Sequence, residues 1–259
     1  MRLAAISDIH GNLPALEAVL ADIAHAGVDV TVNLGDIVSG PLWPSETADR
    51  LMVLDLPTIR GNHERQVLAV APQGPSDAFA AARLSAAQRA WLAALPATRL
   101  LGDDVFCCHG TPSSDLVYFL ETVTSDFERG GAPGMRAASS AEVTTRALDV
   151  AQRLILCGHT HVPRAASLPD GRLIVNPGSV GLQAYDDSHP HEHVVENGTP
   201  HARYALLTRS AAQWQVEFRC VAYDFESAAR RAETNRRGDW ADALRSGRVG
   251  RFQAEVGAA

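Results

Sequence analysis

Apolar and polar positions alternate in a regular order along the first sixty residues. Residues 2–7 form an apolar run typical of a buried strand. Apolar residues then recur at helical spacing from Leu13 to Ile23, with Asn12 placed to cap that helix and Gly27 to end it. The pattern continues as a strand, a helix and a short strand, at residues 28–34, 45–54 and 57–59. This β-α-β-α-β order predicts parallel strands with helices on their faces.

The rest of the chain is less regular. Its patterns predict a helical insertion, two strands, a further helix and two hairpin-like pairs of strands, at residues 76–95, 104–108, 153–157, 141–152, 165–168 with 172–175, and 204–207 with 213–221. Residues 110–140 are rich in Gly, Pro and Ser and are expected to form a cap or long loop, of the kind that is often functional. Residues 224–259 are expected to form a helical tail packed on a single domain that spans residues 1–259.

Charge and composition narrow the classes of function. The chain of 259 residues has a formal charge of −7, which argues against stable nucleic-acid binding, because binding to a phosphate backbone needs an excess of cationic side chains. A small phosphorylated substrate remains compatible with that charge. The segment before Asp8 is too short for a signal peptide, and no apolar run approaches a membrane span. We therefore expect a cytoplasmic protein without membrane contact, whose oligomeric state the sequence does not indicate.

The four cysteines do not resemble a disulfide framework. Two are adjacent and a third lies in another apolar run, at positions 107, 108 and 157, and the last is Cys220. We expect all four to be small, buried apolar side chains.

Residues of the kind that bind metals follow five of the short apolar runs. In chain order these segments are Asp8-Ile-His10, Gly35-Asp36, Gly61-Asn62-His63-Glu64, His109-Gly110 and Gly158-His159-Thr160-His161. A residue just past the end of a strand in an α/β sheet points into the crevice where such sheets bind ligands. An adjacent glycine lets the backbone turn sharply there. The strands are therefore expected to bring these side chains to one edge.

The pooled side chains suit two metal ions. Besides His63 they offer two carboxylates, four imidazoles and one amide, too many donors for one ion but enough for two with a bridging carboxylate. Nitrogen and oxygen donors without a thiolate favour Mn, Fe, Zn, Ni or Co, of which manganese is the preferred candidate. Two divalent ions, two carboxylates and a bridging hydroxide leave a charge of about +1, so the site would attract an anion and hold an activated hydroxide.

The ordered set D-x-H, G-D, G-N-H-E, H-G and G-H-T-H resembles the calcineurin-like metallophosphoesterase superfamily. It is more similar to the small bacterial and archaeal, phosphodiesterase-like branch than to the protein phosphatases. The motifs span residues 8–161, and the segment Asn176-Pro-Gly-Ser-Val180 extends the match. The resemblance implies an α/β fold, a four-layer αββα sandwich of two mixed β-sheets flanked by helices.

The resemblance also implies a role for each motif residue. One ion would be held by Asp8, His10 and His161, the other by Asn62, His109 and His159, with Asp36 as the bridge. His63 matches the family's histidine near the scissile phosphate, which is expected to protonate the leaving oxygen or to stabilise the phosphoryl oxygens. A second interpretation of His63 is that it orients Asn62.

One departure from the family pattern bears on the substrate. Protein phosphatases of the superfamily carry an Asp-Arg-Gly segment after the bridging aspartate, whereas this chain reads Asp36-Ile-Val-Ser39-Gly40. The acid partner and the phosphate-clamping arginine of that segment are therefore missing. This argues against a protein phosphatase and mildly favours a phosphodiester over the more highly charged monoester dianion.

The sequence thus predicts a metal-dependent hydrolase of phosphate esters that acts by in-line attack of a metal-bridging hydroxide. A phosphodiesterase for a small substrate, with a nucleotide as one candidate, is preferred. The first alternative is a phosphomonoesterase with the same site. The second is a non-catalytic protein-binding scaffold, which would be expected to lose ligands that this chain retains.

Substrate contacts are harder to derive from the sequence. Asn12, Arg60 and Tyr118 lie next to the motifs or in the cap, and they are candidates for substrate binding with structural roles as the alternative. The histidines at 189, 191 and 193 are compatible with a further metal site, a substrate rim or a solvated loop.

Overall fold

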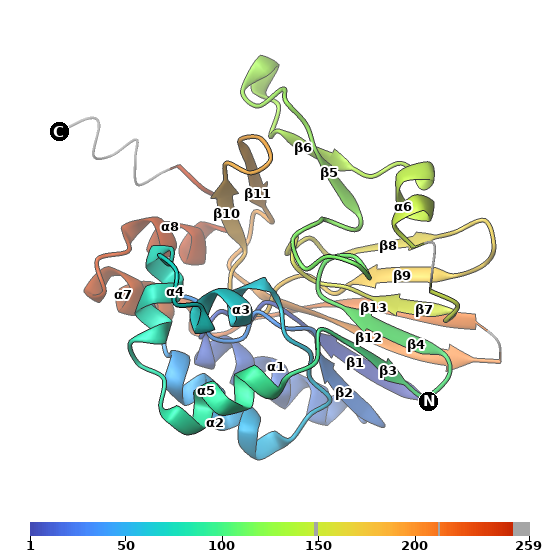
Figure 1. Cartoon of the computed structure of the whole chain (residues 1–259), viewed down its shortest axis with the longest axis horizontal. Coiled ribbons are helices and arrows are strands. Elements are labelled where there is room, and N and C mark those ends of the chain that lie inside the picture. Colours follow the sequence, from blue (N-terminus) through green and yellow to red (C-terminus); the bar gives the residue numbers. More distant parts are fainter. Residues whose placement is uncertain (148–149, 212, 251–259) are drawn as a thin grey trace.

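Two β-sheets packed face to face form the centre of the computed structural model, which describes residues 1–147, 150–211 and 213–250 (Figure 1). The first sheet has the order β13-β12-β1-β2, formed by Gln213–Val221, Ala202–Ser210, Arg2–Ile6 and Val30–Asn33. Strand β1 pairs in parallel with β2 and antiparallel with β12. The first sheet is therefore mixed.

The second sheet is also mixed. Its order is β3-β4-β7-β9-β8, formed by Thr98–Leu101, Val105–Cys108, Leu154–Leu156, Leu173–Asn176 and Arg164–Ser167. The three central strands β4, β7 and β9 run parallel, and the two edge strands are antiparallel to their neighbours. Apolar side chains from the facing surfaces of both sheets, including Leu3, Val32, Val105 and Leu154, form one buried cluster. Removing these side chains from water holds the two sheets together.

Helices cover the outer faces of the sheets. The first sheet packs its Ala4 and Ile6 against Leu16 and Val19 of α1 (Leu13–Ala26), in a cluster that also includes residues of α2 (Pro44–Leu54) and α5 (Ala86–Ala94). On the second sheet, Ile155 packs with Val143 of the short helix α6 (Ser140–Arg146). The layer order is helix, sheet, sheet, helix. The predicted αββα fold class is confirmed.

The C-terminal helices α7 (Phe225–Thr234) and α8 (Gly238–Ser246) pack on the domain through a third apolar cluster. Trp240 of α8 joins Leu42 and Leu182 in that cluster. The predicted helical tail thus has two helices among residues 225–246, and its residues 251–259 lie outside the described part of the chain.

Several predicted elements differ in extent. The insertion predicted at 76–95 is two helices, α4 (Pro75–Ala81) and α5, because Ser85 starts a new helix by accepting a hydrogen bond from the Gln88 amide at 3.2 Å. A short helix precedes them, α3 (Asn62–Leu68). The strand predicted at 57–59 is a single bridge between Asn33 and Thr58. The helix predicted at 141–152 ends at Arg146, and its residues 148–149 are not described.

The predicted cap contains regular structure. Residues 110–140 include a two-stranded hairpin of β5 (Glu121–Val123) and β6 (Met135–Ala137), with the 3-10 turn η1 (Arg129–Gly131) between them. A second hairpin, β10 (Ala184–Asp187) with β11 (His193–Glu196), was not predicted, and it stands beside the first one in Figure 1. Backbone contact joins the two hairpins, because the Val194 amide donates to the Pro133 carbonyl at 2.9 Å.

The exposure of the cysteines tests the prediction that all four are buried. Cys107, Cys108 and Cys157 are buried, but Cys220 is exposed, so the prediction for Cys220 is wrong. The reason is that β13 is an edge strand of the first sheet and Cys220 points to solvent.

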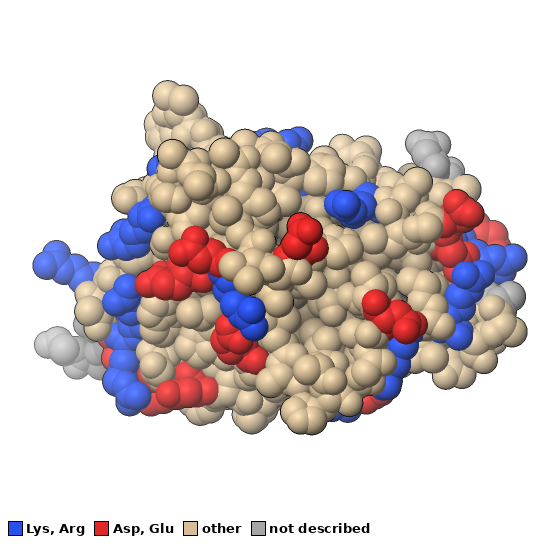
Figure 2. Space-filling model, turned by 90° about the horizontal axis from the view of Figure 1, so that it is seen from below, with Lys and Arg blue, Asp and Glu red and all other residues tan. Residues whose placement is uncertain are grey.

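Acidic and basic side chains are interspersed on the face shown in Figure 2. In the described parts of the chain, no helix combines the length and the apolar character needed to cross a bilayer.

Candidate metal centre

The seven predicted metal ligands meet where strands of both sheets end. Two groups have donor atoms that all lie within 4.8 Å of one another, Asp8 with His10 and His161, and Asp36 with His109 and His159. The seventh residue, Asn62, lies at the second group, with its Oδ1 3.1 Å from Nε2 of His109. The groups adjoin, because the same Nε2 is 3.0 Å from Asp36 and 3.9 Å from Asp8. The structure brings all seven side chains together, and their binding of metal stays a prediction.

Each group draws side chains from both sheets. Asp8 and His10 follow β1 of the first sheet, whereas His161 follows β7 of the second. In the same way, Asp36 follows β2 and His109 follows β4. The carboxyl ends of parallel strands in two packed sheets therefore form one crevice, rather than the edge of a single sheet.

Five of these residues have left-handed backbone conformations. Their φ angles are 56° at Asp8, 52° at His10, 54° at Asp36, 71° at His159 and 59° at His161. A non-glycine residue with positive φ is uncommon, and such strain costs of the order of 1–3 kcal/mol per residue. Its concentration at the candidate ligands indicates that the fold gives up stability to aim these side chains at one point.

Backbone carbonyls fix the tautomers of three histidines. Nδ1 of His10, His109 and His161 lies 2.8 Å from the carbonyl oxygen of Ser39, Leu34 and Leu182, respectively. A carbonyl oxygen only accepts, so each Nδ1 carries the proton and donates it. In the neutral ring the Nε2 lone pair then faces the centre, which is the usual arrangement of a histidine that binds metal.

The facing donor atoms fit a cation. Nε2 of His10 lies 3.1 Å from Nε2 of His161, and both atoms present lone pairs in the tautomers that their carbonyl partners require. Nε2 of His109 faces Oδ1 of Asn62 in the same way. Lone pairs at this separation repel one another unless a proton or a metal ion lies between them. The donor set of nitrogen and oxygen atoms without a thiolate suits the divalent ions expected from the sequence.

Burial and neighbouring charges shift the pKa values of the histidines in the centre. Burial lowers the pKa of His10 to about 3 and that of His159 to about 4, so these imidazoles are neutral at pH 7. Burial also disfavours charge on His109, but the adjacent Asp36 and Asp8 carboxylates raise its pKa to about 10. A metal cation would compete with that proton for Nε2, so binding is expected to release it.

Glu64 holds the turn that carries Asp36. Its buried carboxylate accepts hydrogen bonds from three backbone amides, Asp36 at 2.9 Å, Ile37 at 2.7 Å and Gly61 at 2.7 Å. The glycine is required here, because a Cβ at position 61 would collide with the Asp36 carboxylate. Nothing in the sequence pattern marks Glu64 as the residue that holds this turn.

The segment 176–180 supports the opposite side of the centre. Nδ2 of Asn176 donates to the Gly158 carbonyl at 2.7 Å and to the Thr160 hydroxyl at 2.9 Å, which fixes the turn between the two histidines after β7. The hydroxyl of Ser179 donates to the carbonyl of Asp8 at 2.8 Å. This motif therefore ties the ends of β1 and β7 together.

His63 has a partner that the sequence did not reveal. Its Nδ1 lies 2.8 Å from Oδ1 of Asp77, a buried residue in the first turn of α4, and its backbone amide donates to Asp36 at 3.0 Å. Burial lowers the pKa of His63, but the carboxylates of Asp36 and Asp77 outweigh that effect and raise the pKa to about 9. Asp77 thus gives His63 an acid partner, although the segment directly after Asp36 carries no acid.

Comparison with known proteins identifies the family. The model of the calcineurin-like phosphoesterase superfamily domain matches residues 1–196. The chain belongs to this superfamily. An uncharacterized protein from Methanocaldococcus jannaschii is 26% identical over 265 residues, covering 92% of this chain and 94% of its own length.

Solved structures agree with that assignment. A metallophosphoesterase from Sphaerobacter thermophilus is 25% identical, with a TM-score of 0.69 over 93% of this chain and 100% of its own. A provisionally assigned diadenosine tetraphosphatase is 17% identical, with a TM-score of 0.52 over 85% of this chain and 94% of its own, and it shares the fold. The chain is therefore a calcineurin-like phosphoesterase with candidate groups for divalent metals.

The predicted substrate contacts of this calcineurin-like phosphoesterase lie in different settings. Asn12 is buried and caps α1, and its Nδ2 donates to the Gly181 carbonyl at 2.8 Å and to Tyr223 at 3.0 Å. Tyr118 is also buried, with its hydroxyl 2.7 Å from that of Tyr185. Arg60, partly exposed, is next to the Gly61-Asn62 turn, and within the described residues its guanidinium has no hydrogen-bond or ion-pair partner. Contact of the three with substrate stays a prediction.

The histidine-rich loop divides in two. His189 and His191 are exposed, whereas His193 is buried with its Nε2 2.9 Å from the Tyr118 hydroxyl. Tyr118 packs edge-on against His159, and Tyr185 packs against His161. His193 therefore supports the candidate ligands His159 and His161 through Tyr118 and Tyr185. The sequence pattern did not predict this role.

Proposed function

We propose that this calcineurin-like phosphoesterase hydrolyses phosphodiesters at a centre of two divalent metal ions, with manganese as the preferred metal. One ion would be held by Asp8, His10 and His161, the other by Asn62, His109 and His159, and Asp36 would lie between them. The proposal rests on the adjoining donor groups and on one further observation, the position of His63 with its partner Asp77 at their edge.

His63 is placed to supply the proton that the leaving group needs. Its ring centroid is 5.4 Å from that of His10, so the imidazole borders the donor groups without joining either of them. Because Nδ1 is engaged by Asp77, Nε2 is the atom left to carry a proton toward the leaving oxygen. Asp77 fixes the orientation of the ring in this role.

The metal ions and the protein residues would have different roles in the reaction. When bound, the two cations would stabilise the phosphoryl oxygens and supply an activated water. Asp36 would hold the cations together by its charge, and Glu64 keeps Asp36 in place through the backbone amides. The mostly buried donor groups exclude bulk water, which strengthens every electrostatic contact at the centre.

Charge near the centre favours a diester over a monoester dianion. Two arginines that could neutralise a dianion are already paired, Arg65 with Asp115 at 2.8 Å and Arg164 with Glu121 at 2.7 Å. Arg60, next to the Gly61-Asn62 turn, is then the unpaired arginine that remains near these motifs in the described part of the chain, so few arginines are available for the second charge of a monoester dianion. A small diester, with a nucleotide as one candidate, is therefore the preferred substrate.

The test is a metal-reconstituted assay on one preparation with matched diesters and monoesters. We expect a higher kcat/KM for an alkyl or nucleoside diester than for the corresponding monoester, and no turnover after chelation. A higher kcat/KM for monoesters would instead support the phosphomonoesterase. Bound metal without turnover on any ester would support a non-catalytic scaffold.

His63→Ala tests the proton donor. The change should cost roughly 10²–10⁴-fold on an alkyl ester and much less on a nitrophenyl ester, whose leaving group departs readily without a proton. His25→Ala, on the exposed face of α1, is the matched control and should change neither rate. Equal losses on both esters would mean that His63 stabilises phosphoryl oxygens instead.

A further inference from the structure

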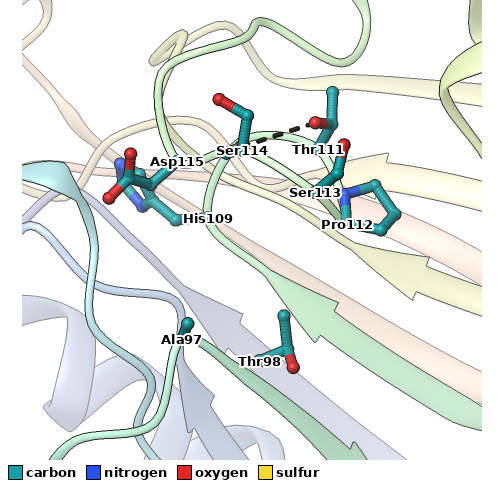
Figure 3. Close-up of a pocket in the computed structure, with 8 residues that line it drawn as sticks. All are labelled: Ala97, Thr98, His109, Thr111, Pro112, Ser113, Ser114 and Asp115. Atoms are coloured by element: carbon teal, nitrogen blue, oxygen red, sulfur yellow. Dashed lines mark hydrogen bonds between the residues drawn. The ribbon is translucent and has the colours of Figure 1, made fainter.

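A pocket of about 280 Å³ opens beside His109. It is lined by Ala97, Thr98, His109, Thr111, Pro112, Ser113, Ser114 and Asp115, and we call it the His109 pocket. Figure 3 shows Ala97 and Thr98 on one side and the loop 111–115 on the other. Its size is at the small end of ligand sites, so it would take a fragment of a substrate rather than a large molecule.

The His109 pocket adjoins the candidate metal centre through one shared residue, His109. His109 forms part of its wall and is also the side chain whose Nε2 lies 3.0 Å from Asp36. The loop that forms the opposite wall reaches the centre again, because Nε2 of His159 lies 3.2 Å from the Leu116 carbonyl oxygen. A phosphate held at the centre would therefore have a substituent within reach of this pocket.

Hydroxyl groups dominate the lining. Within the described residues, the side-chain oxygens of Thr98 and Ser113 have no hydrogen-bond partner. The Ser114 hydroxyl accepts from the Leu116 amide at 3.2 Å, which leaves its proton free to donate. The pocket thus offers donors and acceptors at its rim, as a ligand with several hydroxyls requires.

Asp115 gives the pocket an ionised carboxylate, which is paired with Arg65. Burial favours the neutral carboxyl, but the two hydrogen bonds from Arg65, at 2.9 and 2.8 Å, outweigh that effect and lower the pKa of Asp115. An ionised carboxylate accepts strongly from hydroxyl groups. None of the lining residues is an arginine or a lysine that could bind a second phosphate, and the nearby Arg65 is already paired with Asp115.

The lining of this pocket offers few contacts for an aromatic ligand. His109 is the only aromatic ring in its lining, and that ring is engaged at both nitrogens, by Leu34 on Nδ1 and by the centre on Nε2. A planar base would stack poorly against Thr, Ser and Pro.

We infer that the His109 pocket binds a neutral, non-aromatic polyol substituent of the phosphodiester, with Asp115 as the residue that recognises its hydroxyl groups. This inference rests on the proposed function and adds to it the class of the alcohol. A glycerol-like or sugar alcohol group meets the requirements of size, charge and hydrogen bonding, whereas a nucleobase or a second phosphate does not.

The kinetic test compares two diesters that differ only in hydroxyl groups, glyceryl methyl phosphate and propyl methyl phosphate. Product formation is followed by ³¹P NMR. The wild type is expected to prefer the glyceryl ester, and Asp115→Asn should lower that preference by roughly 10–100-fold, the usual worth of a hydrogen bond to a charged group. Arg65→Gln is the matched variant, because it breaks the same ion pair and leaves the carboxylate in the pocket. It should retain most of the preference.

A binding measurement separates this inference from the proposed function. Ribitol added to metal-free protein should shift the backbone amide NMR signals of residues 97–98 and 111–115, with weaker shifts in Asp115→Asn. Equal shifts in both proteins, no shifts there, or no preference for the glyceryl ester would overturn the inference. Ribitol shifts at the pocket without hydrolysis of any diester would count against the proposed function alone.

Discussion

Nδ1 of His63 lies 2.8 Å from Oδ1 of Asp77, and this contact joins helix α3 to helix α4. The two residues are 14 positions apart, and nothing in the intervening sequence marks the aspartate as a partner. The protein phosphatases of the superfamily carry an acid shortly after the bridging aspartate, whereas the acid that contacts His63 here comes from a later helix. Helix α4 therefore contributes an acid to the edge of the candidate site.

Asp77→Asn should lower kcat on an alkyl diester by roughly 10–100-fold, the usual effect of losing a residue that orients a functional histidine. KM and bound metal should change little, because Asp77 belongs to neither donor group. Steady-state kinetics with metal analysis on the same samples would check this. Asp103→Asn, at an exposed turn, is the control. An unchanged kcat, or a loss of metal as large as the loss of activity, would contradict the role given to Asp77.

Asp36→Asn should remove both metal ions and reduce turnover by at least roughly 10³-fold, because a negative charge between two cations is what offsets their repulsion. His161→Ala should lower the occupancy of one position more than the other. Mass spectrometry of native protein, with metal counted per chain, distinguishes these outcomes. Retention of two ions by Asp36→Asn, with near-normal turnover, would show that Asp36 does not bridge.

Gly61→Ala should disable the centre without unfolding the protein. The added Cβ would collide with the Asp36 carboxylate, so the side chain has to move out of the group that it forms with His109 and His159. We expect metal affinity to fall at least roughly tenfold, with a circular dichroism spectrum like that of the wild type. Gly102→Ala is a useful control, because a Cβ there meets no atom within 4 Å, although its φ of 60° also disfavours alanine. Normal metal affinity in Gly61→Ala would refute the steric argument.

Asp22 makes the stability of the fold depend on pH. Hydrogen bonds from Arg219 and from the buried Tyr204 lower its pKa below the ordinary 3.8. A carboxyl with a lowered pKa in the folded state stabilises the protein above its unfolded pKa, and this contribution is lost as the pH falls through the folded pKa. Asp22→Asn should therefore cost about 1 kcal/mol of unfolding free energy at pH 7 and progressively less below pH 3.8. Urea unfolding from pH 7 to pH 3 measures the difference, and a constant difference would contradict the argument.

The sequence was sufficient for the parts of the site that follow directly from strand ends. Asp8, Asp36, His109 and His159 each come just after an apolar run, so their convergence depended only on the order of strands. The fold class came from the family resemblance, since the periodicity of the first sixty residues does not indicate a second sheet.

Contacts between loops that are distant in the sequence could not be predicted from strand ends. The carbonyl oxygens that fix the tautomers belong to residues such as Ser39 and Leu182, whose identity is irrelevant because only their backbone takes part. The support of His159 and His161 by Tyr118 and Tyr185 depends on a hairpin that no pattern predicted. Bonds made by backbone atoms or by long-range packing leave no local mark in a sequence.

Each donor group contains side chains from both sheets. The distances between the donor atoms therefore depend on how the two sheets pack against each other. Leu34 lies in the buried layer between the sheets, and its carbonyl oxygen holds Nδ1 of His109 from across that layer. A cavity made there by Leu34→Ala would let one sheet slide relative to the other and would displace donors of both groups together. Packing of the apolar layer would then affect metal affinity, so selection for metal binding would also constrain the apolar layer on which the fold depends.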